Sequence, residues 1–138
     1  MLKRTVPCML AALCAAPAAL AQKVEPGEWQ ITSTVTSPMF PKAETRVERH
    51  CVRKEEVDDP NRWMGQMAPD CKVTTKGQSA DSLSWEVSCP QTGMRGTGTM
   101  RWTRTSMDID MEMAGNMQGQ KFEMKSRVSG KRVGPCKN

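Results

Sequence analysis

A run of seven residues from Met107 to Met113 (MDIDMEM) alternates sulfur or aliphatic side chains with carboxylates. Thioethers are soft ligands that select Cu(I) in exported proteins, so a methionine cluster could hold copper. The sulfurs that could converge, if the strands pair as argued below, belong to Met111, Met113 and Met124. Methionine also fills irregular cores and adaptable apolar surfaces, and a strand period alone explains this spacing. We therefore favour a core or a cavity lining, keep the copper site as the alternative, and predict no cofactor.

Side chains suited to enzyme catalysis are few in this sequence. Asp108, Asp110 and Glu112 share one strand face at a spacing of about 6 to 7 Å, which could suit paired carboxylates. Basic residues expected opposite them favour an exposed, charge-paired face instead. His50 is the single histidine, which we interpret as a surface or strand-edge residue, and no serine nucleophile motif is present. The sequence therefore predicts that the protein is not an enzyme.

The first 21 residues have the features of an export signal. Lys3 and Arg4 precede an apolar run, and Ala19-Leu-Ala21 supplies the small residues that a signal peptidase recognises. The apolar run is shorter than the ~20 residues that a membrane span needs. We expect residues 1–21 to be cleaved, which leaves a single periplasmic domain of residues 22–138 that does not span a membrane.

The charge of this expected domain is mild. Residues 22–138 carry 18 basic and 15 acidic side chains, so their net charge is +3. Acids and bases are interspersed, whereas nucleic-acid binders concentrate positive charge on one face. The expected partner is therefore a hydrophobic small molecule or another exported protein, and not a nucleic acid.

Four cysteines follow the export signal: Cys51, Cys71, Cys89 and Cys136. Four cysteines allow three disulfide pairings. A zinc site is the alternative, but the chain has no Cys-x-x-Cys pair after the signal and only one histidine. Pairing Val73 with Val87 across a hairpin also sets Cys71 opposite Cys89. We predict that disulfide, with Cys51–Cys136 as the second, while the other pairings stay open.

Alternation of apolar and polar residues dominates the domain, and this is the period of a half-buried strand. Seven such stretches are expected, at about residues 29–35, 44–51, 71–75, 83–89, 96–102, 107–113 and 122–128. Asp59-Pro60, followed by apolar residues on one side, predicts a short helix over residues 60–67. The fold class is therefore all-β with one short helix, a curved antiparallel meander that forms a half-barrel or a small barrel.

The last hairpin can be given a register. With Gln118-Gly119 as its turn, Met113 lies opposite Met124 on the apolar face. On the other face, Glu112 then meets Lys125, and Asp110 meets Arg127. The charge match is independent of the apolar match, and this agreement supports the pairing.

The preceding hairpin follows the same test. With Arg104-Thr105 as its turn, Trp102 faces Met107 and Arg101 faces Asp108. Gly98 and Gly96 then lie opposite Met111 and Met113, where they leave room for long side chains and allow strong curvature.

One face of the expected sheet gathers the large apolar side chains. Its candidate ligand-binding residues are Trp85, Met100, Trp102, Met107, Met111, Met113, Phe122 and Met124. A curved sheet with such a concave face could enclose an apolar molecule, although the same side chains could also fill the interior themselves. We therefore predict a non-enzymatic module that binds a hydrophobic ligand or partner through this Met- and Trp-rich face.

Several short motifs occur in a characteristic order: the Ala-x-Ala signal, Pro26-Gly-Glu-Trp29, Cys51, the Cys71 and Cys89 hairpin, Gly96-Thr-Gly98, the Met-rich hairpin, and Ser129-Gly-Lys-Arg-Val-Gly-Pro-Cys136. In this order the chain resembles the small exported bacterial proteins grouped as domain of unknown function 3617. The resemblance implies export and a β-rich domain, and it brings no catalytic residues. The chain departs from that pattern at Arg53, where members usually have a capping Ser or Thr, which weakens the expectation of a helical turn there.

Overall fold

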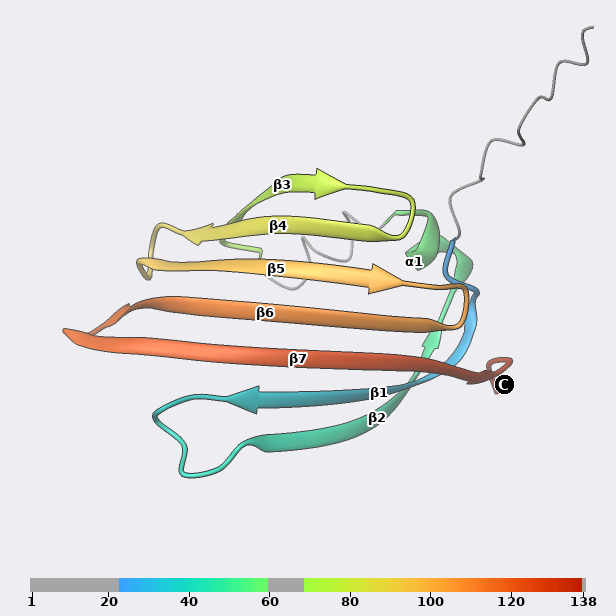
Figure 1. The fold of residues 1–138 in the computed structure, drawn as a ribbon, viewed down its shortest axis with the longest axis horizontal. Coiled ribbons are helices and arrows are strands. Elements are labelled where there is room, and N and C mark those ends of the chain that lie inside the picture. The colour runs from blue at the N-terminus through green and yellow to red at the C-terminus, as the bar shows by residue number, and fades with distance from the viewer. Residues whose placement is uncertain (1–22, 60–68, 138) are drawn as a thin grey trace, which may run out of the picture.

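The computed structural model describes residues 23–59 and 69–137 (Figure 1). Its elements are β1 (Gly27–Thr36), β2 (Glu44–Val52), α1 (Lys54–Asp58), β3 (Lys72–Gln78), β4 (Ser82–Cys89), β5 (Met94–Trp102), β6 (Ser106–Met117) and β7 (Gln120–Gly134). The predicted all-β class with one short helix is confirmed. The predicted signal segment and the helix predicted over residues 60–67 lie outside the described residues.

All seven strands form one antiparallel sheet in the order β2-β1-β7-β6-β5-β4-β3 (Figure 1). Strands β3 to β7 follow one another as a meander, and β1 then pairs with β7. The first and last strands are therefore neighbours, as in a closed barrel, but β2 and β3 form the two edges of the sheet. The sheet is open, so the half-barrel form of the prediction holds and the small closed barrel does not.

Both predicted hairpin registers are confirmed. Met113 lies opposite Met124, and Trp102 lies opposite Met107. Gln118 and Gly119 form the turn with φ angles of 52° and 81°, the left-handed pair that a two-residue hairpin favours. Two of the predicted outer-face charge matches form ion pairs, at 3.4 Å for Lys125–Glu112 and 3.6 Å for Arg127–Asp110, and Arg101 lies opposite Asp108 in the register.

Two disulfides hold the sheet at separate places, and they are the predicted pairs. Cys71–Cys89 joins the start of the β3–β4 hairpin to its end, with Cα atoms 4.2 Å apart. Cys51–Cys136 joins β2 to the tail after β7, across 85 residues of chain, with Cα atoms 5.4 Å apart. The second bond therefore anchors an edge strand to the C-terminal end of the domain.

The buried residues lie on one face of the sheet. The main cluster is Leu83, Trp85, Val87, Cys89 and Ile109. Trp29 is buried apart from this cluster. It is only 1% exposed and donates its indole N–H to the Glu25 carbonyl at 3.0 Å. A Cβ added to Gly130 would touch both Trp29 and Met107, which shows that these side chains lie over the β7 backbone.

The two glycines of β5 make room for one expected side chain and one that was not expected. A Cβ at Gly96 would lie 2.9 Å from Cγ of Met113, so the prediction of space for a thioether holds there. At Gly98, which lies opposite Met111 as predicted, the three atoms nearest to an added Cβ all belong to Trp85 from β4. The indole ring lies so close that a Cβ would overlap its Cε2 and Cζ2 atoms. The indole ring of Trp85 therefore packs directly on the backbone of Gly98.

Candidate functional site

A groove of about 370 Å³ opens on the apolar face near the β4–β5 turn. We call it the methionine groove. Its apolar lining consists of Pro69, Val73, Trp85, Val87, Met94, Met111, Met113 and the Cys71–Cys89 disulfide. Its polar lining includes Asp70, Gln91 and Thr92. A concave apolar site with a few polar groups has the general character of a small-molecule pocket.

The strands give the groove a rigid floor and adaptable walls. Trp85 and Val87 alternate along β4, and both are buried. Met111 and Met113 alternate along β6 and are half-buried, so part of each side chain faces solvent. Thioether side chains are flexible and polarizable, so these walls can adjust their shape to a bound molecule.

The structure brings together only some of the predicted ligand-binding residues. Trp85, Met111 and Met113 line the methionine groove. The other predicted residues are half-buried and lie outside its lining: Met100, Trp102, Met107, Phe122 and Met124. They are spread along β5, β6 and β7 rather than gathered at one end.

Besides the disulfide, four apolar lining residues were missing from the predicted ligand-binding set: Pro69, Val73, Val87 and Met94. Val73 and Val87 are paired across β3 and β4, and Met94 lies opposite Cys89. The predicted β3–β4 register already contained the signal for the two valines, because it set both on the face of Trp85. Met94 could have been found only by extending β5 beyond the predicted start of that strand.

The three methionines of the copper alternative share one region of the apolar face. Met113 and Met124 are paired across β6 and β7, and Met111 is two residues from Met113 on the same strand face. The described residues contain no group of three or more His, Cys, Asp or Glu side chains that could hold a metal ion. A copper site on this face would therefore rest on thioethers.

The carboxylates that could have suited catalysis lie away from the methionine groove. Asp108, Asp110 and Glu112 are exposed on the opposite face. Arg127 and Lys125 form ion pairs with the last two. The geometry therefore agrees with a solvated, charge-paired strand face.

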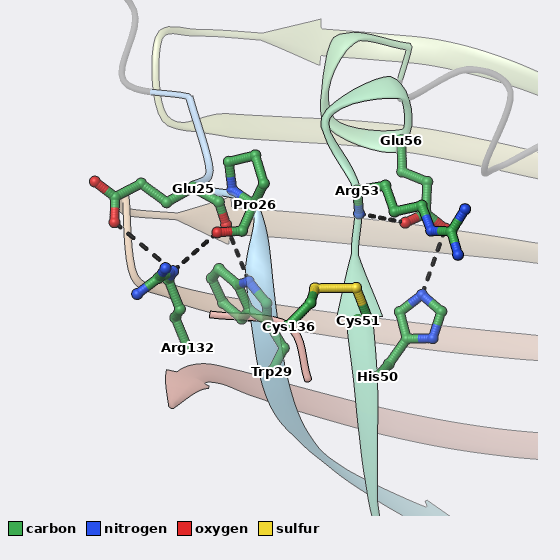
Figure 2. Close-up of a disulfide and its surroundings, with 9 residues drawn as sticks. All are labelled: Glu25, Pro26, Trp29, His50, Cys51, Arg53, Glu56, Arg132 and Cys136. Carbon is green, nitrogen blue, oxygen red and sulfur yellow. Dashed lines mark hydrogen bonds and ion pairs between the residues drawn. A yellow bond between two sulfur atoms is a disulfide. The ribbon is translucent and has the colours of Figure 1, made fainter. Parts of the chain in front are cut away.

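His50 lies on edge strand β2, as predicted, with its Nε2 3.4 Å from a carboxylate oxygen of Glu56 (Figure 2). The other Glu56 oxygen accepts a 2.8 Å hydrogen bond from the Arg53 backbone N–H. This backbone bond lowers the pKa of Glu56, as does His50, against the opposing effect of partial burial. The expectation that Arg53 weakens this helical turn is wrong, because Glu56 caps α1 from within the helix.

The Cys51–Cys136 disulfide belongs to a structural cluster at the end of the sheet (Figure 2). Arg132 donates its Nε–H to the Pro26 carbonyl at 2.9 Å and lies 3.9 Å from Glu25. Arg104 makes a second ion pair with Glu25. These contacts hold the segment before β1 against β7 and over Trp29. The cluster therefore has a structural role and is not an open binding site.

Comparison with known proteins identifies a family for this chain. Within the part of the chain that the structure describes, no helix is long and apolar enough to cross a membrane. A search of curated proteins found no match. The family described as "Protein of unknown function (DUF3617)" matches residues 24–136, which covers every strand of the sheet. The chain therefore belongs to the DUF3617 family.

Proposed function

We propose that this protein is an exported, non-enzymatic binding module that holds a hydrophobic small molecule in the methionine groove. The observation that carries the proposal is an apolar groove whose walls, Met111 and Met113, are half-exposed above a buried floor. A single exposed apolar side chain is common in folded proteins, so the meaning of these two methionines lies in their place beside the groove. Half-exposed methionines beside a concavity are suited to contact a second molecule.

The size and lining of the groove support a small apolar ligand. Its volume of about 370 Å³ falls at the lower end of the ~300 to 1,000 Å³ typical of ligand pockets. Export is supported by the signal-like N-terminal sequence and by two disulfides, which persist in oxidising compartments. The chain would then take up an apolar molecule in the periplasm.

A charge placed in the groove tests the proposal. Met113→Glu is expected to weaken the uptake of an apolar fluorescent probe, N-phenyl-1-naphthylamine, at least about tenfold, because an unpaired carboxylate is costly to bury against a ligand. The matched control is Ala114→Glu, which puts the same charge on the next residue, exposed on the other face and between Arg95 and Glu123. Circular dichroism would verify that both variants are folded.

Equal probe binding by the two variants would remove the methionine groove as the ligand site. Native mass spectrometry of protein isolated from the periplasm gives an independent readout. A co-purified lipid-like molecule is expected in the wild type and is expected to be lost from the Met113→Glu variant.

The second candidate function is Cu(I) handling, which the pairing of Met113 with Met124 beside Met111 favours. If these thioethers bind copper, replacing Met111 and Met113 by leucine should weaken Cu(I) binding at least about tenfold in a competition titration under mild reduction. The same leucines keep the groove apolar, so probe binding should change little. Unchanged copper affinity would exclude these two side chains as ligands.

A further inference from the structure

β2 is a long edge strand whose side chains are exposed to solvent. It is nine residues long, pairs with β1 on one side, and is the terminal strand of the sheet (Figure 1). An edge strand of this length offers unpaired backbone N–H and C=O groups to another strand. Its residues are exposed from Glu44 to His50, and Val47 is 60% exposed although it is apolar.

The side chains of β2 carry alternating charges on one face. The register with β1 sets Glu44, Arg46 and Glu48 on the same face, opposite Val35, Ser33 and Ile31. These three charged side chains form no hydrogen bond or ion pair with any residue that the structure describes. By contrast, Arg49 on the other face pairs with Glu28. One row of charges therefore stands unmatched along a free strand edge.

We propose that β2 pairs with β2 of a second copy of this chain, antiparallel and with Val47 opposite Val47. A two-fold axis through this point sets Arg46 of each copy opposite Glu48 of the other. It also sets Glu44 of each copy opposite His50 of the other, but His50 already lies 3.4 Å from Glu56 of its own chain, so the charge match rests on Arg46 and Glu48. Opposite charges directly across a strand pair stabilise the pairing. The two open sheets would join into one continuous sheet through an isologous contact.

The charge pattern selects this register over its neighbours. Centring the axis on Arg46 would set Arg46 against itself and Glu44 against Glu48. Centring it on Glu48 would set Glu48 against itself and Arg46 against His50. Centring it on Thr45 pairs Arg46 with Glu44 but keeps only three residues of β2 in the ladder. Like charges directly opposite one another destabilise a strand pair, so the Val47 register is favoured.

Charged residues on an edge strand also protect proteins from unwanted pairing. Charges on an edge strand disfavour pairing with most other strands. A row that alternates positive and negative charges can still pair with a strand that carries the opposite charges at the facing positions. The sequence of β2 reads in reverse order on a second copy, so the chain supplies its own complementary strand. Specific pairing through complementary charges is compatible with exclusion of other strands.

Charge reversal tests the proposal in a way that loss of folding cannot imitate. Sedimentation velocity of the oxidised protein, over a range of concentrations, is expected to show a reversible dimer. Arg46→Glu alone should raise its dissociation constant at least about tenfold, because the new carboxylate would face Glu48 of the other copy at two symmetric places. Glu48→Arg alone should have a similar effect, and the double variant R46E/E48R should restore the dimer.

Mixing the two single variants gives the most specific result. Each should be monomeric by itself, but together they should form a heterodimer, because each glutamate at position 46 or 48 then faces an arginine. Lys121→Glu is the control, since it makes a charge reversal of the same kind at an exposed position of β7. A wild-type protein that stays monomeric up to about 1 mM would overturn the proposal. A dimer whose dissociation constant does not change in any of the β2 variants would also overturn the proposal. This holds as well if Met113→Glu disrupts that dimer, since its interface would then lie elsewhere.

Discussion

Replacing Cys51 and Cys136 together by alanine is expected to lower the free energy of unfolding by about 4 to 5 kcal/mol. The bond joins residues 85 apart, so its loss returns a large loop entropy to the unfolded chain. The effect is large for a domain of this size, because total stabilities are only about 5 to 15 kcal/mol. Urea unfolding followed by tryptophan fluorescence would measure it.

We also predict which strand is destabilised most when the Cys51–Cys136 disulfide is removed. Among the strands that the structure describes, β2 pairs with β1 alone, so it should open first when the bond that anchors its end is removed. Hydrogen exchange should therefore accelerate in Glu44–Val52 and remain slow in β4 to β6. Peptide mapping would verify that Cys71–Cys89 is still intact. A loss below about 1 kcal/mol would show that the long-range bond contributes little to this fold.

Gly98→Ala is the second change with a large expected effect, about 3 kcal/mol of lost stability. The added Cβ would overlap the indole of Trp85, which is itself 3% exposed and surrounded by the core cluster. Neither the ring nor the β5 backbone can move without disturbing that cluster. Urea unfolding would measure the loss, and near-ultraviolet circular dichroism would report a displaced tryptophan.

The matched control is Gly134→Ala. Nothing lies within 4 Å of a Cβ added at Gly134, so its stability should change by less than about 0.5 kcal/mol. A double-mutant cycle with Trp85→Leu adds a further check, since the smaller side chain should make Gly98→Ala less costly. If Gly98→Ala were as mild as Gly134→Ala, the tryptophan could not be seated on Gly98 as described.

The hairpins were predictable because their information is local. The register of β6 and β7 follows from two independent signals, an apolar pair at Met113 and Met124 and a charge pair at Glu112 and Lys125. A slip by one residue would exchange the two faces, so these signals exclude other registers. The Cys71–Cys89 disulfide follows from the same kind of parity in β3 and β4.

The position of β1 in the sheet and the position of the groove depended on contacts between distant parts of the chain. β1 lies between β2 and β7, and its pairing joins Thr36 to Lys125 and Glu28 to Gly134. The stretch of β1 that pairs with β7 is rich in uncharged threonine and serine, so no charge match marks β7 as its neighbour. The position of the methionine groove was likewise hidden, because it depends on where the sheet leaves half-buried side chains uncovered.

The sequence by itself determined the approximate strands, the two hairpin registers, the Cys71–Cys89 pairing and the face that carries the large apolar side chains. Each depends on residue periodicity or on pairing across a short turn, which sequence separation hardly obscures. Only the tertiary structure decided that the sheet is open between β2 and β3, that Trp85 rests on Gly98, and that Met111 and Met113 border the groove. Those features arise from the packing of distant strands in three dimensions, where the shape of the gaps between side chains, and not their order along the chain, sets the result.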